Sequence, residues 1–202
     1  YLSIAPKAGA FAMMIRFFNQ VFSDGGALSG MDVVSVSNIP WASILSLLAV
    51  ITMTLGNVVA LQQNNIKRML AYSSVAHAGY MLLAMPVMSS ESIYAIMIYL
   101  VMYLFMNLGA FFIVILVKNK TGGETFEDYK GLGWEMPTVG ICMTIFMVSL
   151  TGLPPTAGFI GKFYIFASLI KGGGNFYWLV FAGAINSVIS LYYYLKVVKV
   201  MF

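Results

Sequence analysis

Charged side chains are scarce in this sequence. Only 9% of its 202 residues are Asp, Glu, Lys or Arg, while 60% are hydrophobic. An ordinary soluble domain has about 25% charged residues, so the shortage excludes a typical water-soluble fold. The hydrophobic residues come in runs of about 20, the length that crosses the hydrocarbon core of a bilayer as a helix. We therefore expect lipid rather than water to surround most of the chain.

Residues that hold cofactors are equally rare. The single cysteine, Cys142, excludes an intrachain disulfide, a cysteine-ligated cluster and a structural zinc site. The single histidine, His77, has no second histidine or carboxylate at the spacing of helical metal ligands. The sequence also has no glycine-rich phosphate loop and no recognisable catalytic triad. We expect no cofactor, metal or redox centre in this chain.

Basic residues exceed acidic ones, yet they form no pattern for nucleic acid. The net charge is +4, but the eleven Lys and Arg residues are scattered among hydrophobic segments. They do not form a stripe that alternates with aromatic side chains. We expect the chain to meet a lipid bilayer and not a nucleic acid.

Six segments of membrane length predict an all-α, multi-pass membrane protein with one transmembrane domain over residues 1–202. The segments are residues 2–22, 41–62, 68–88, 92–117, 137–170 and 175–200. The chain begins with Tyr1 and has no signal-peptide pattern, so we expect an internal fragment of a longer protein.

Lys and Arg gather on one side of the membrane if the six segments cross it alternately. That side has seven basic residues: Lys67, Arg68, Lys118, Lys120, Lys130, Lys196 and Lys199. The other side has Lys171, Arg16 and the acids Asp24, Asp32 and Glu91. Because basic residues concentrate in cytoplasmic connections, we expect the seven-residue side to face the cytoplasm or its organellar equivalent.

The fifth segment is too long for one straight span. As a single helix, residues 137–170 would measure ~50 Å at 1.5 Å per residue. Two prolines and two glycines between Gly152 and Gly158 predict two half-helices that flank an irregular link. Interrupted helices mark ion or substrate sites in transporters, because unpaired peptide groups at membrane depth need protein or water around them. A kink that only improves packing is the alternative.

Lys162, directly after this break, is the strongest candidate for a functional residue. An ionisable side chain at bilayer depth costs about 2.5–3.5 kcal/mol on insertion scales, so its presence needs a reason. The charge of a lysine there depends on its neighbours, as a proton relay requires. A fixed cation that binds the free carbonyl groups of the broken helix is the alternative.

His77 is the second candidate, because it lies near the middle of the third segment. It titrates near physiological pH. Ser73, Ser74 and Tyr80 share its helix face, and their hydroxyl groups can bond the ring or hold water. A neutral histidine that joins two helices is the alternative to a relay.

Other polar residues have simpler interpretations. We expect Arg16 to anchor its helix at the headgroups and Lys199 to extend to the surface beside an interfacial aromatic cluster, residues 192–194. The role of Lys196 stays open. Packing is expected for Asn107 and Asn186, with interhelical hydrogen bonding as the alternative.

Two stretches carry a family resemblance. Residues 64–80, NNIKRMLAYSSVAHAGY, closely resemble the signature of the antiporter-like subunits of respiratory complex I and of multisubunit sodium/proton antiporters. Residues 152–164, GLPPTAGFIGKFY, look like the broken helix of the same family. Within it, residues 5–16, 128–133 and 191–198 resemble the subunit N, or subunit 2, branch of the NADH-quinone oxidoreductases.

The resemblance implies a longer subunit with two inverted repeats of about five helices each. Residues 41–200 would be the second repeat, preceded by one helix. In the family, buried lysines and histidines carry protons along a polar axis, and the motif match assigns Lys7, His77 and Lys162 to it. NADH, FMN, iron-sulfur clusters and quinone would belong to other subunits, and other antiporter-like subunits of the membrane arm would be partners.

The resemblance thus predicts a proton-translocating subunit of an NADH:quinone oxidoreductase, driven by quinone reduction elsewhere in the complex. A subunit of a sodium/proton antiporter or of a membrane-bound hydrogenase is one alternative. A structural membrane subunit that conducts no ions is another. The expected location is the bacterial plasma membrane, with an organellar inner membrane or a thylakoid as alternatives.

Overall fold

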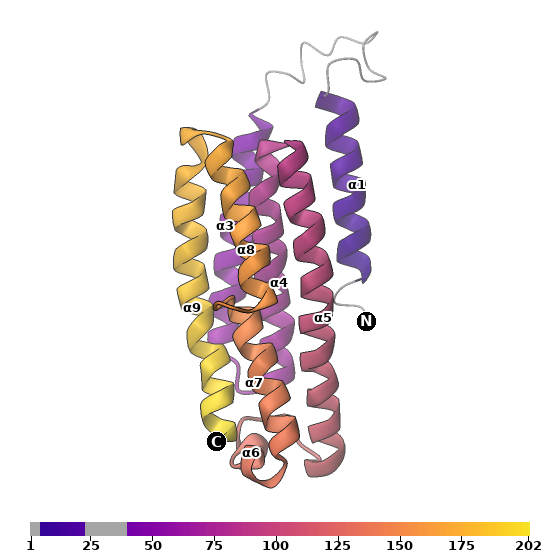
Figure 1. Ribbon diagram of the computed structural model, residues 1–202, viewed down its shortest axis with the longest axis vertical. Helices are drawn as coiled ribbons and strands as arrows, with labels where there is room; N and C mark the ends of the chain where they lie inside the picture. Colours follow the sequence, from indigo (N-terminus) through magenta and orange to yellow (C-terminus); the bar gives the residue numbers. More distant parts are fainter. Residues whose placement is uncertain (1–4, 23–39) are drawn as a thin grey trace.

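The computed structural model describes residues 5–22 and 40–202, which form an elongated bundle of α-helices (Figure 1). Within these ranges the only β-type pairing is an isolated bridge between Asn65 and Thr125. The expectations for residues 2–4 and for the acids Asp24 and Asp32 concern residues outside the described ranges.

Helices occupy the described part of every expected segment. The long ones are α1 (Ala5–Phe22), α3 (Trp41–Leu61), α4 (Ile66–Ala84), α5 (Ser90–Thr121), α7 (Pro137–Thr151), α8 (Ala157–Lys171) and α9 (Tyr177–Met201). The short ones in the connections are η1 (Met85–Val87), η2 (Glu127–Tyr129), α6 (Leu132–Glu135) and η3 (Gly174–Phe176). All-α architecture is therefore confirmed.

Local sequence explains where several of these helices begin and end. The side chain of Asn65 accepts a 3.0 Å bond from the Arg68 amide and starts α4. Ser89 accepts a 3.0 Å bond from the Ser92 amide and starts α5. Helix α5 ends at Thr121 and is followed by Gly122, whose φ of 80° favours a residue without a Cβ.

The expected break in the fifth segment is confirmed. Helix α7 ends at Thr151 and α8 begins at Ala157, with the two prolines in the link between them. Each half-helix has 15 residues, fewer than the ~20 that span a bilayer. By length and composition, three described helices can cross a membrane, or four if residues 127–135 and 137–151 form one bent span. This criterion counts fewer spans than the six expected.

Helix α4 lies inside the bundle, where it packs against α3, α5, α8 and α9. Its closest neighbour is α3. A Cβ added at Gly79 would lie 2.6 Å from the Met53 amide nitrogen, and one at Gly56 would lie 2.6 Å from that of Ala76. The two glycines thus allow the backbones to approach closely, and polar side chains on α4 are held at the bundle centre.

Helix α1 stands to one side, next to α5, and begins near the mid-height of the bundle (Figure 1). Between the two helices is a cleft of about 570 Å³, lined by Phe11 and Ile15 of α1 and by Leu100 and Leu104 of α5, among others. The first turn of α1 is therefore at the depth of the bundle centre rather than at its end.

Basic residues gather at the end of the bundle where α4 begins and α5 and α9 end (Figure 1). There Glu124 accepts from Lys118 at 2.8 Å and from Lys67 at 3.4 Å. The Lys118 ammonium group is the main cause of a lowered pKa of the Glu124 carboxyl. At the opposite end, Lys171 pairs with Glu91 at 2.8 Å. Most of the basic residues thus lie at one end of the bundle, as six alternate crossings predict.

Candidate functional site

Lys162 points from α8 back to the end of α7. Its amine donates a 2.8 Å hydrogen bond to the backbone oxygen of Thr151, the last residue of α7. It donates a second bond, of 3.1 Å, to the hydroxyl oxygen of Ser187 on α9. The side chain is only 5% exposed, and no carboxylate of the described residues pairs with it. The amine is thus buried and held by neutral groups.

Tyr80 of α4 completes the surroundings of this amine. The Lys162 nitrogen lies 4.4 Å from the centre of the Tyr80 ring, a cation–π distance. The Tyr80 hydroxyl is 3.1 Å from the Ser187 hydroxyl, and either oxygen can be the donor. Ser187 therefore touches both groups and connects them through its hydroxyl.

His77 is held between two tyrosine hydroxyl groups. Its Nδ1 lies 2.6 Å from the hydroxyl of Tyr99 on α5, and its Nε2 lies 3.1 Å from that of Tyr194 on α9. The ring is 2% exposed. A neutral imidazole has one donor and one acceptor nitrogen, while a hydroxyl can act as either. Both tautomers are therefore satisfied, and a proton can enter on one side of the ring and leave on the other.

The serines on the His77 face bond to their own helix rather than to the ring. The Ser73 hydroxyl donates to the carbonyl of Leu70 at 2.8 Å, and the Ser74 hydroxyl to that of Ala71 at 2.6 Å. Back-bonding of this kind is common for serine inside helices. Neither serine bonds the ring, because tyrosines from two other helices bond both ring nitrogens, while the alternative that the serines hold water stays a prediction.

Lys7 joins the same region from α1. Its amine donates a 2.5 Å bond to the carbonyl oxygen of Ser74 in the middle of α4. This contact places the Lys7 amine at mid-depth in the bundle. It also lies 5.8 Å from the ring centre of Tyr103, whose ring centre is 4.9 Å from that of His77. The structure thus brings Lys7, His77 and Lys162 into one polar region at the bundle centre.

The side chains of Asn57 on α3 and Asn186 on α9 form an amide cluster that joins these two helices. The Asn57 side-chain amide donates to the side-chain oxygen of Asn186 at 2.9 Å, and Asn57 accepts from the Tyr193 hydroxyl at 2.9 Å. The packing role expected for Asn186 is therefore wrong, since it is an interhelical bonding partner. Tyr193 and Tyr194 are buried rather than interfacial, and of residues 192–194 only Tyr192 is exposed.

The other candidate residues lie outside this region. Lys196 is near the basic end, with its amine 4.4 Å from the ring centre of Phe126. It is nine residues beyond Ser187 on α9, or ~14 Å along the helix. Arg16 and Lys199 are exposed, and Asn107 is buried on α5. Across residues 5–22 and 40–202, no three His, Cys, Asp or Glu side chains group in a way that could hold a metal ion.

Comparison with known proteins places this geometry in a family. The family described as "NADH:quinone oxidoreductase/Mrp antiporter, TM" matches residues 2–190. The chain belongs to this family. A curated member, NADH-quinone oxidoreductase subunit N 2 of Sorangium cellulosum, is 50% identical over the whole chain. The chain spans about two fifths of that relative, 39% of its length.

Chains in two solved membrane complexes have a similar fold. Respiratory complex I from Thermus thermophilus with bound aureothin contains a chain with a TM-score of 0.67 and 35% identity, over 79% of this chain and 36% of that one. The Mrp complex from Dietzia gives a TM-score of 0.74 at 21% identity, over 81% of this chain and 30% of that one. The second likeness concerns the fold alone.

Proposed function

We propose that this chain is the second inverted repeat, with the helix before it, of a subunit that moves protons across a membrane in a complex I-type NADH:quinone oxidoreductase. Quinone reduction in other subunits would drive the movement. The bacterial relatives named subunit N favour a plasma membrane location and other antiporter-like subunits as partners.

One observation carries the proposal: a buried lysine beside a helix break is linked through the Ser187 hydroxyl to Tyr80, whose ring lies next to that of His77. The amine of Lys162 touches Ser187, and Ser187 touches Tyr80. The ring centre of Tyr80 is 6.0 Å from that of His77. Polar groups of this kind inside a membrane bundle mark ion and proton pathways.

Each group has a role in the proposed relay. Lys162 and Lys7 take up and release protons at their amines, and His77 passes a proton between its two nitrogens. Tyr99 and Tyr194, which bond the ring, hold the imidazole plane in place and can each give or accept a proton. Water between these groups would complete the path.

Lys162→Gln tests the assignment, because glutamine keeps a hydrogen-bond donor but cannot be charged. In the complete complex, reconstituted in proteoliposomes, we expect quinone reduction to continue while the number of protons moved per electron falls. Lys171→Gln is the matched control, since Lys171 is an exposed lysine on the same helix. It should pump at the wild-type ratio.

The assignment fails if the Lys162→Gln complex assembles normally and pumps at the wild-type ratio. Sodium uptake in place of proton uptake would instead support a sodium/proton antiporter subunit. If single variants of Lys7, His77 and Lys162 all pumped normally, the result would favour a structural membrane subunit that conducts no ions.

A further inference from the structure

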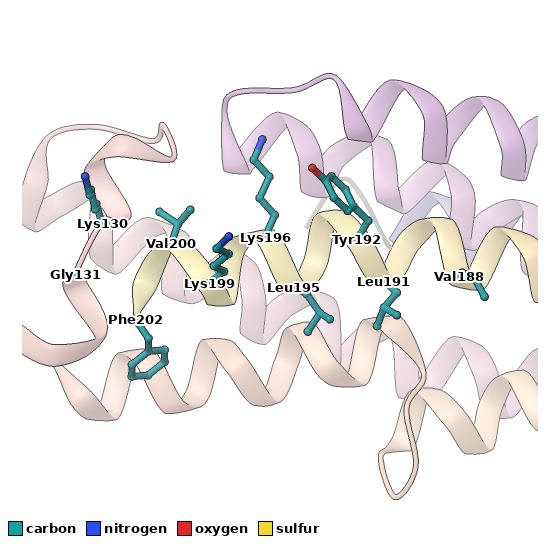
Figure 2. A pocket seen from close by; sticks show the side chains of 10 residues that line it. All are labelled: Lys130, Gly131, Val188, Leu191, Tyr192, Leu195, Lys196, Lys199, Val200 and Phe202. Carbon is teal, nitrogen blue, oxygen red and sulfur yellow. The ribbon is translucent and has the colours of Figure 1, made fainter.

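A groove of about 910 Å³ runs along the surface of α9 to the basic end of the bundle (Figure 2). Lys130, Lys196 and Lys199 line one part of it, and Val188, Leu191 and Leu195 line another. We propose that this groove binds one anionic phospholipid. Its headgroup phosphate would contact the three lysines, and an acyl chain would lie along the three aliphatic residues.

The charge at the groove is not balanced by the protein. Other lysines at this end are neutralised, since Lys67 and Lys118 pair with Glu124, and Lys120 with Glu135. Lys130, Lys196 and Lys199 have no such carboxylate partner among the residues that the structure describes. In Figure 2 the amines of Lys130 and Lys196 extend in the same direction, from two different segments. A phosphate is the complementary ligand for such a cluster.

The groove as a whole, from its apolar end to its lysines, has about the length of one leaflet's hydrocarbon layer. Val188 and Lys199 are eleven residues apart on α9, or ~16 Å along the helix axis. Half of the ~30 Å hydrocarbon core of a bilayer is about the same distance. Tyr192 lies between them, 65% exposed, at the level where tyrosines meet the headgroup boundary. The groove therefore changes from charged to apolar along the membrane normal, as a lipid does.

A lipid fits this gradient better than a small anion. Val188 is 68% exposed, and Leu195 is 41% exposed. A free phosphate would contact the lysines but leave these aliphatic side chains uncovered. The acyl chain of a lipid held at the lysines covers them, because it continues from the headgroup along the same face of α9. The occupant is thus one molecule with both an anionic and an aliphatic part.

Photocrosslinking in the complete complex tests the proposal at the site itself. The complex is reconstituted in vesicles that contain a phosphatidylglycerol with a photoreactive acyl chain, and crosslinked peptides are mapped. We expect a crosslink within residues 188–195. The Lys130→Gln, Lys196→Gln, Lys199→Gln triple variant should need about a hundredfold more of this lipid for half-maximal yield, since each surface lysine gives about fivefold.

Matched controls separate this site from general surface charge. The Lys67→Gln, Lys118→Gln, Lys120→Gln triple variant loses the same charge at the same end and should keep the wild-type crosslink. Photoreactive phosphatidylcholine should crosslink weakly. Equal crosslinking of both lipids, equal loss in both triple variants, or no crosslink in the wild type would overturn the proposal. So would removal of the crosslink by inorganic phosphate, which would assign the groove to a free anion.

Discussion

The Lys162 amine bonds to the carbonyl oxygen of Thr151, so the side chain of one half-helix closes the end of the other. Carbonyl groups in the last turn of a helix have no partner within that helix. At membrane depth a carbonyl group without a hydrogen-bond partner is costly, because lipid offers no donor. Lys162 therefore stabilises the break in addition to its proposed proton-carrying role, and substitutions can separate the two.

Lys162→Ala should destabilise the protein, because it removes the bond to Thr151. A hydrogen bond that involves a charged group contributes about 1.5–3 kcal/mol, so the thermal midpoint should fall measurably. Lys162→Gln keeps a donor and should lose less than the alanine variant. Thermal unfolding of the detergent-solubilised complex measures both changes. Equal midpoints for the two variants would mean that the bond to Thr151 contributes nothing to stability.

Tyr99→Phe and Tyr194→Phe should each leave one nitrogen of His77 without its hydroxyl partner. An unsatisfied buried polar group costs about 1–3 kcal/mol, and the loss should also slow proton transfer across the ring. Proton uptake per electron in proteoliposomes measures the effect. Tyr192→Phe is the control, since Tyr192 is exposed next to Tyr194 on α9. If the control slowed pumping as much, the role of the ring contacts would be contradicted.

Gly79→Ala should strongly destabilise the bundle, because its new Cβ would lie 2.6 Å from the Met53 amide nitrogen of α3. Overpacking typically costs about 1–3 kcal/mol, and a backbone contact cannot move aside as a side chain can. Gly9→Ala adds the same methyl group on α1, where no heavy atom lies within 4 Å. That variant should be at least as stable as the wild type, because alanine is favoured over glycine inside a helix. Thermal unfolding compares them, and equal midpoints would contradict the close approach of α3 and α4.

Glu124 should make the basic end sensitive to acid. The Lys118 ammonium group holds the pKa of this carboxyl below its usual value of 4.5. The contribution of Glu124 to stability is thus present above pH 4.5 and is lost as the pH falls through the lower folded-state pKa. The wild type should be more stable than Glu124→Gln at pH 7, and the difference should shrink towards pH 3. Glu127→Gln, at a nearby exposed carboxylate, should show a smaller difference at pH 7.

The helices and the break could be predicted from the sequence because both depend on local patterns. Hydrophobic runs give the helices, and the prolines after Gly152 give the link that follows Thr151. Burial of Lys162 followed from its distance to either end of its segment. These properties need no knowledge of which helices are neighbours.

The partners of the site residues could not be predicted, because they come from helices that are distant in sequence. Tyr99 is 22 residues and Tyr194 is 117 residues from His77. The tyrosine run at residues 192–194 has the composition of an interfacial cluster. The orientation of α9 about its axis nevertheless buries two of its members. The packing of α9 against α3, α4 and α7 decides which tyrosines are buried.

The division of the fifth segment into α7 and α8 also constrains how the protein enters the membrane during synthesis. Each half-helix has 15 residues, which is too few for stable insertion alone. We therefore expect the insertion machinery to handle both halves as one hydrophobic stretch. The prolines set the place of the link, but the polar groups there gain partners only when Lys162 reaches Thr151 and α9 supplies Ser187. We therefore expect insertion of the stretch to come before its link is fully hydrogen-bonded.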